Sequence, residues 1–135
     1  MLSHETDVLI LCGGLGTRLR AMVSDRPKPL ADVRGKPFVE HVISLSQGQG
    51  FSRVTLCIAH QASAVRSHFS SRPDLRFSEE PQPLGTAGAI RWAARRGLTD
   101  PFLVLNGDSL CEVDLHGLLE VHASSQAVAS LSAVP

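Results

Sequence analysis

The sequence predicts an α/β fold in which helices cover both faces of a mainly parallel sheet. Short apolar runs alternate with longer mixed segments along the whole chain, and strands that alternate with helices favour a parallel sheet. The 135 residues are 43% hydrophobic and 19% charged, which is a globular composition. Without a repeat, a low-complexity tract or a linker to divide them, we expect residues 1–135 to form one unit.

Each element follows from its local pattern. The expected strands cover residues 8–12, 54–59, 75–78 and 102–105, and a fifth begins within 127–134. The expected helices cover residues 37–47, 61–69, 85–97 and 115–122. Right-handed crossovers place the carboxyl ends of parallel strands at one edge, where such sheets bind ligands. We therefore expect the functional residues in the loops that follow the strands.

The chain ends in or just after the fifth expected strand, with no covering helix and no polar tail. We therefore expect a domain that is truncated at its C-terminus. Val128, Leu131 and Val134 would stay exposed beside an unpaired strand edge. Self-association into a homo-oligomer and weak nucleotide binding are the expected consequences.

Bulk properties exclude several classes of protein. Thirteen basic residues balance thirteen acidic ones, and no basic cluster exceeds the pair Arg95-Arg96, so a nucleic-acid surface is not expected. The N-terminal apolar run is too short to span a membrane and lacks the features of a signal peptide. Cys12, Cys57 and Cys111 lack metal-ligand spacing, which indicates reduced packing residues and a cytoplasmic protein.

A glycine-rich loop follows the first strand directly. Gly13, Gly14 and Gly16 allow the backbone to approach a ligand closely, and successive N–H groups in such a turn attract an anion. Arg18 adds a planar cation suited to phosphate. A dinucleotide fingerprint fails because Leu19 stands where glycine is required, and a P-loop fails because no Gly-Lys-Ser/Thr follows. The alternative is a purely structural tight turn.

Two further segments carry charged candidates. Pro27 and Pro29 are expected to hold the backbone extended and project Lys28 toward a second phosphate, unless that lysine is simply solvated. Asp108 follows the fourth strand, and a carboxylate at this edge suits Mg²⁺. The alternative role for Asp108 is to cap the next helix.

Between the third strand and its helix, small residues would let a flat base approach closely. They are Gly85, Ala87 and Gly88. Tight packing of the helix on the sheet is an equally open reading of this segment.

Together these segments resemble the sugar nucleotidylyltransferase family. The resemblance rests on four motifs in order, namely residues 11–19, 26–30, 83–89 and 106–108. Within the family it is strongest to guanylyltransferases of D-glycero-α-D-manno-heptose 1-phosphate. Mannose-1-phosphate guanylyltransferases and uridylyltransferases share much of the pattern. The resemblance implies a Rossmann-like three-layer sandwich, with residues 1–135 as the N-terminal, nucleotide-binding part of the domain.

The resemblance also implies roles. A sugar 1-phosphate would attack the α-phosphorus of a nucleoside triphosphate, with Mg²⁺ as cofactor on Asp108. Arg18 and Lys28 would act on the phosphates as catalytic residues. The nucleotide would contact Leu11, Gly13, Gly14, Gly16, Thr17, Glu80, Gln82, Gly85 and Thr86. The family usually supplies a second metal-binding acid from chain beyond residue 135.

Three rival functions fit the sequence less well. A non-catalytic relative would generally lose Arg18 or Lys28, yet both are present. A nicotinamide-dependent oxidoreductase is disfavoured by the failed fingerprint. A metal-binding module is disfavoured because the six histidines show no ligand spacing.

Overall fold

A parallel four-stranded sheet forms the centre of the fold. The computed structural model describes residues 4–13 and 27–133. The sheet contains β1 (Asp7–Leu11), β4 (Arg53–Ile58), β5 (Leu75–Glu79) and β6 (Leu103–Asn106). Their order is β5-β4-β1-β6, and every neighbouring pair is parallel. The predicted α/β class with a mainly parallel sheet is confirmed.

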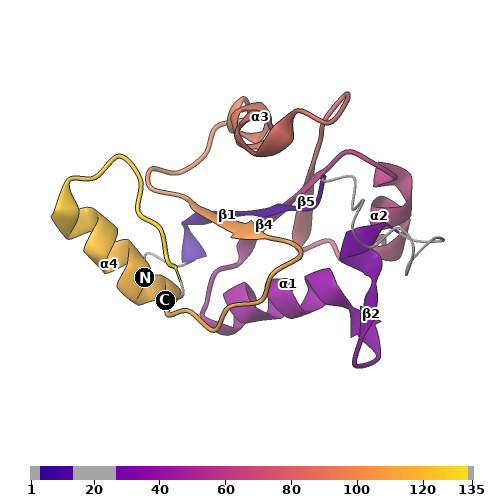
Figure 1. Ribbon diagram of the computed structural model, residues 1–135, viewed down its shortest axis with the longest axis horizontal. Helices are drawn as coiled ribbons and strands as arrows, with labels where there is room; N and C mark the ends of the chain where they lie inside the picture. The colour runs from indigo at the N-terminus through magenta and orange to yellow at the C-terminus, as the bar shows by residue number, and fades with distance from the viewer. Residues whose placement is uncertain (1–3, 14–26, 134–135) are drawn as a thin grey trace.

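Helices lie on both faces of this sheet (Figure 1). They are α1 (Phe38–Gly48), α2 (Ala62–His68), α3 (Gly85–Ala94) and α4 (Leu115–Ser125). Helix α3 covers one face, and α1 lies against the other. The arrangement is the three-layer sandwich that the alternating pattern predicts.

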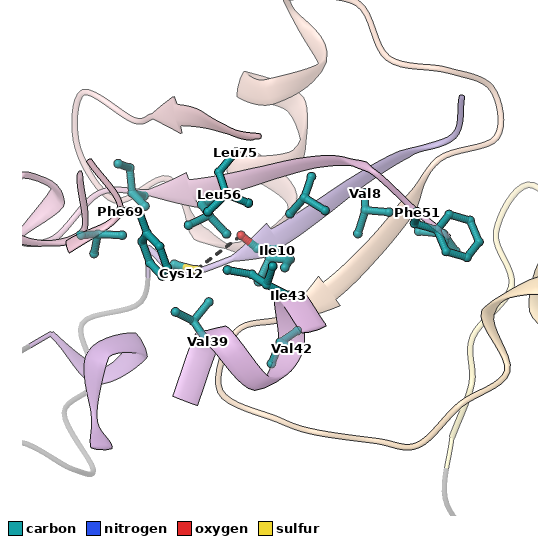
Figure 2. Close-up of a cluster of buried hydrophobic side chains, with 14 of the residues drawn as sticks. Val8, Ile10, Cys12, Val39, Val42, Ile43, Phe51, Leu56, Phe69 and Leu75 are labelled. Atoms are coloured by element: carbon teal, nitrogen blue, oxygen red, sulfur yellow. Dashed lines mark hydrogen bonds between the residues drawn. The ribbon is translucent and has the colours of Figure 1, made fainter. Parts of the chain in front are cut away.

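The side chains of β1 divide between the two faces, as the period of two in a strand requires. Val8 and Ile10 belong to the larger core cluster, which includes residues from α1, α2 and the start of α4. Figure 2 shows Val39 and Ile43 of α1 reaching toward β1 in this cluster. Leu9 joins the smaller cluster with Ala89 and Ala93 of α3. The centre of β1 is therefore buried from both sides.

The order of the strands explains where a ligand can bind. From β1 the chain crosses through α1 to β4 and through α2 to β5, and then returns through α3 to β6 on the other side of β1. Because crossovers keep one hand, this reversal puts α3 on the opposite face from α1. The carboxyl ends of β1, β5 and β6 therefore lie at one edge of the sheet, where folds of this type bind their ligands.

The fifth expected strand is wrong for residues 127–133, which form no strand. They follow Gln126, whose left-handed φ of 56° ends α4, and Ser130 Oγ lies 3.0 Å from Nδ1 of His122 in that helix. A strand exists only when its backbone pairs with a neighbour, and residues 127–133 pair with no described strand. Val128 and Leu131 are fully exposed, as the sequence predicted, while Val134 lies outside the described part.

The backbone around Lys28 also differs from the prediction. Pro27 is extended, but Lys28–Leu30 form one 3₁₀ turn, η2, in which the N–H of Leu30 donates to the Pro27 carbonyl at 2.9 Å. The fixed φ of Pro29 suits a 3₁₀ turn as well as an extended chain. A small hairpin of β2 (Asp32–Val33) and β3 (Lys36–Pro37) follows and was not predicted.

Three smaller corrections follow from local geometry. Helix α3 ends at Ala94 rather than at Gly97, whose φ of 80° is incompatible with a helix. Helix α4 extends three residues beyond the predicted His122 to Ser125. Cys12 and Cys57 are buried packing residues, but Cys111 is exposed because it lies in the loop before α4.

Candidate active site

A cavity of about 420 Å³ lies at the carboxyl edge of the sheet. It is lined by the carboxyl ends of β1 and β6, by the segment that follows β5, by α3 and by η2. The lining residues are Leu11, Cys12, Gly13, Lys28, Pro29, Glu80, Pro83, Gly85, Thr86, Ala89, Asn106, Gly107 and Asp108. Segments that are far apart in the sequence therefore meet where this type of sheet binds its ligands.

Two glycines allow the backbone to pack closely at this edge. The N–H of Gly107 donates to the Leu11 carbonyl at 2.9 Å, which extends the contact between β1 and β6 beyond the strand. A Cβ at position 107 would lie 2.7 Å from that same oxygen. A Cβ at position 13 would lie 2.7 Å from Oε2 of Glu80. Any larger residue at either position would therefore displace the walls of the cavity.

The charged residues of the cavity include one ion pair. Nζ of Lys28 lies 2.8 Å from Oδ2 of Asp108, although 80 residues separate the two in sequence. The hydrogen bond from Lys28 lowers the pKa of the Asp108 carboxyl, with a smaller contribution from Ser109. Asp108 does not cap the next helix, because Asp114 accepts from the N–H of Gly117 at 3.0 Å and is the N-cap of α4.

Glu80 is the buried acid of the cavity, with only 6% of its surface exposed. Its backbone N–H donates to the Ile58 carbonyl at 2.8 Å, which extends β5 past its last residue. Oε1 accepts from the N–H of Leu84 at 3.0 Å. Oε2 is buried and has no hydrogen-bond partner in the described part of the chain. A buried acceptor without a donor is costly, and a ligand that brings one would relieve that cost.

The start of α3 supplies backbone to the same cavity. Gly85 has a φ of 77°, a conformation that favours glycine and turns the chain into the helix. Thr86 and Ala89 follow it on the cavity wall. Unpaired N–H groups at a helix N-terminus attract negative charge, so phosphate is favoured here.

The side chains of the cavity fit a magnesium ion that is bound mainly by the phosphate groups of a substrate. Among the described residues there is no group of three or more His, Cys, Asp or Glu side chains that could hold a metal. Asp108 offers one partly exposed carboxylate, and Mg²⁺ commonly binds one or two carboxylates together with phosphate oxygens and water. Asp108 is therefore the residue that would hold the ion.

Most of the predicted site residues that can be placed come together in this cavity. They are Leu11, Gly13, Lys28, Glu80, Gly85, Thr86 and Asp108. Gln82 is exposed and does not line the cavity. Gly14, Gly16, Thr17 and Arg18 lie outside the described residues.

Sequence reasoning missed a few residues of the wall. Pro29, Pro83 and Ala89 line the cavity, and each lies within three residues of a predicted site residue. Their position beside the motifs was the available signal. Cys12 was expected to be a packing residue, and it both packs and lines the cavity.

Comparison with known proteins identifies the family. The family model described as "Nucleotidyl transferase" matches residues 7–135. The chain belongs to the nucleotidyl transferase family. It is 36% identical over 132 residues to the D-glycero-alpha-D-manno-heptose 1-phosphate guanylyltransferase of Aneurinibacillus thermoaerophilus, covering 96% of this chain and 57% of that protein. The mannose-1-phosphate guanylyltransferase of Mycobacterium tuberculosis is 34% identical, over 99% of this chain and 38% of its own length.

A solved structure shows the same fold in another nucleotidyl transferase relative. HddC from Yersinia pseudotuberculosis, complexed with GMP-PN, superposes with a TM-score of 0.76 at 36% identity. The match covers 87% of this chain and 54% of that one. The chain therefore spans about half the length of the relatives it matches here. No helix among the described residues is long and apolar enough to cross a membrane.

Proposed function

We propose that residues 1–135 form the N-terminal, nucleotide-binding part of a sugar-1-phosphate guanylyltransferase. In this reaction a phosphate oxygen of the sugar 1-phosphate attacks the α-phosphorus of GTP. The bond between the α-phosphorus and the bridging oxygen breaks, and pyrophosphate leaves. The observation that carries the proposal is the cavity at the carboxyl edge of the sheet, which combines Lys28, Asp108 and Glu80 with the start of α3.

The buried carboxylate of Glu80 supports guanine as the base. A carboxylate only accepts hydrogen bonds, and Oε2 lacks a donor in the described part of the chain. The Watson–Crick edge of guanine carries two adjacent donors, the N1–H and the N2 amino group. Uracil and thymine carry one N–H between two carbonyl oxygens, which a carboxylate repels. A charge-assisted bond from guanine to Glu80 would therefore favour GTP over the pyrimidine nucleotides.

Lys28 and the start of α3 support binding of the triphosphate. An ammonium group is a compact positive charge for phosphate oxygens, and α3 presents its N-terminus to the same cavity. We propose that Arg18, which lies outside the described residues, binds the departing pyrophosphate. The attacking phosphate needs no strong base, because its second pKa of about 6 leaves it mostly dianionic at neutral pH. Positioning and charge neutralisation then lower the barrier.

Asp108 is the proposed ligand of Mg²⁺. When bound, magnesium supplies positive charge that neutralises phosphate oxygens in the transition state. Asp108 fits this role because it is ionised, partly exposed and located at the lysine end of the cavity. The free thiols of Cys12 and Cys57 favour a reducing compartment, and we propose the cytoplasm as the site of the reaction.

The identity of the sugar rests on the relatives named above, which act on a heptose 1-phosphate or on mannose 1-phosphate. We propose heptose 1-phosphate as the substrate, and mannose 1-phosphate is the alternative substrate. A uridylyltransferase is disfavoured by the buried carboxylate of Glu80.

Nucleotide-dependent stabilisation tests the proposal. The thermal midpoint of the chain is measured with GTP, UTP, ATP or NAD, each with Mg²⁺. GTP should raise the midpoint most, since a ligand stabilises the state that binds it, and NAD should leave it unchanged. Pyrophosphate release is then measured with GTP and each sugar 1-phosphate. Equal stabilisation by NAD, or none by any triphosphate, would contradict the assignment.

A further inference from the structure

The two charged groups proposed for the phosphates and the metal neutralise each other in the unliganded protein. Lys28 donates to Asp108 at 2.8 Å, and the side chains are 26% and 45% exposed. Lys28 starts the 3₁₀ turn between two prolines, and Asp108 follows Gly107, which is bonded to the end of β1. Both residues are therefore carried by backbone with restricted freedom. Their contact is a property of the resting site.

We propose that the Lys28 ammonium occupies the metal-binding position on Asp108 until a nucleoside triphosphate binds. The inference rests on the proposed function, and it concerns the coupling between the two ligands. Oδ2 accepts from Lys28, so a divalent ion that approaches this oxygen meets an ammonium group already bound there. Competition for one oxygen, together with repulsion between two cations, weakens binding of the free ion.

Nucleotide binding removes this competition. Phosphate oxygens offer the Lys28 ammonium a second partner inside the same cavity. Once Lys28 turns toward them, Asp108 is left as an unpaired carboxylate beside a triphosphate, and that arrangement favours a divalent cation. Each ligand therefore increases the affinity for the other by the same factor. The chain binds the ion and the nucleotide together much better than it binds either alone.

The sequence offers a matched pair of variants for a test. Lys28 and Lys36 are the only lysines of the chain. Lys36 lies in β3, and it does not line the cavity. Lys28→Met removes the ammonium and keeps most of the apolar stem. Lys36→Met changes the net charge of the chain by the same amount, but outside the cavity. Mn²⁺ replaces Mg²⁺ as the probe, because free Mn²⁺ is measured directly by electron paramagnetic resonance.

Mn²⁺ affinity without nucleotide is the first measurement. Lys28→Met should bind Mn²⁺ roughly fivefold more tightly than the unchanged chain, from the loss of one partly exposed pair. Lys36→Met should match the unchanged chain, and Asp108→Asn added to Lys28→Met should abolish the gain. Circular dichroism checks the fold of each variant. Equal affinity in Lys28→Met and the unchanged chain, or no Mn²⁺ binding by any variant, would overturn the proposal.

The coupling between ion and nucleotide is the second measurement. GTP should tighten Mn²⁺ binding by a larger factor in the unchanged chain than in Lys28→Met, and an equal factor would also overturn the proposal. Failure of the proposed function looks different. In that case GTP does not bind to the unchanged chain even at saturating Mn²⁺, while the effect of Lys28→Met on free Mn²⁺ persists.

Discussion

The Glu80 carboxylate lies against the backbone of Gly13, and a methyl group at position 13 would stand 2.7 Å from Oε2. Gly13 follows β1, and Glu80 follows β5, two strands away. The absence of a side chain at position 13 is what leaves room for the acid inside the cavity. The first glycine of the loop therefore shapes the proposed base site as well as the backbone.

Gly13→Ala should weaken nucleotide binding more than it weakens the fold. The atom in the way is the far end of a flexible side chain, so Glu80 can rotate aside, but its carboxylate then leaves the proposed base site. We expect GTP affinity to fall roughly tenfold, the size of one hydrogen bond to a charged group. Isothermal titration measures the affinity, and urea unfolding measures the stability. A large loss of stability with unchanged affinity would contradict this interpretation.

Glu80→Gln should relax the choice of base. An amide presents both a donor and an acceptor, so it can pair with uracil, and it loses the charge-assisted bond to guanine. GTP affinity should fall roughly tenfold, and the ratio of GTP to UTP affinity should fall further. Gln82→Ala is the control, because Gln82 is exposed and does not line the cavity. An unchanged ratio in Glu80→Gln would show that another group selects the base.

Gly107→Ala should destabilise the fold itself. Its Cβ would meet the Leu11 carbonyl oxygen at 2.7 Å and Sγ of Cys12 at 3.0 Å, and a backbone carbonyl inside a sheet cannot move aside. Overpacking of this kind costs roughly 1–3 kcal/mol. Gly48→Ala is the matched control, because nothing lies within 4 Å of its Cβ position at the end of α1. Urea unfolding distinguishes the two, and equal midpoints would contradict the prediction.

Asp7 should contribute to stability and not to ligand binding. It is 2% exposed, and its carboxylate accepts from Arg53 Nε at 3.0 Å and from the Thr99 N–H at 2.9 Å. Asp7→Ala leaves both donors without that acceptor, which should cost roughly 2–4 kcal/mol of unfolding free energy. Glu112→Ala, at an exposed position before α4, should cost roughly 0.5 kcal/mol or less. A loss of GTP affinity in folded Asp7→Ala would contradict the separation of roles.

The three thiols should react at different rates in the native state. Burial raises the pKa of the Cys57 thiol to about 12, with a contribution from the charge of Glu80. Burial also raises the pKa of Cys12, with smaller contributions from Cys57 and Asp108. Both thiols therefore stay protonated at pH 8, while Cys111 is exposed. Mass spectrometry after iodoacetamide treatment should find Cys111 modified first, and equal rates should appear only in urea.

Local patterns were sufficient for much of the fold. The local pattern predicted β1, β4, β5 and β6 to within one residue at each end. The signal is strongest in β1, because a strand buried on both faces needs a nearly continuous apolar sequence. The local pattern failed for residues 127–133, whose sequence suits a strand but whose backbone finds no partner among the described residues. Strand formation depends on a neighbour, and a local pattern does not contain that information.

The sequence by itself determined the family and the positions of the charged and glycine residues, because the motifs follow the strands directly. Only the tertiary structure decided which of these residues touch. Lys28 reaches Asp108 across 80 residues, and Glu80 becomes buried against Gly13 across two strands of the sheet. The physical reason is that such contacts depend on the strand order β5-β4-β1-β6, which brings the loops after β1, β5 and β6 to one edge. The burial of Glu80 and the Lys28–Asp108 ion pair both arise at this edge.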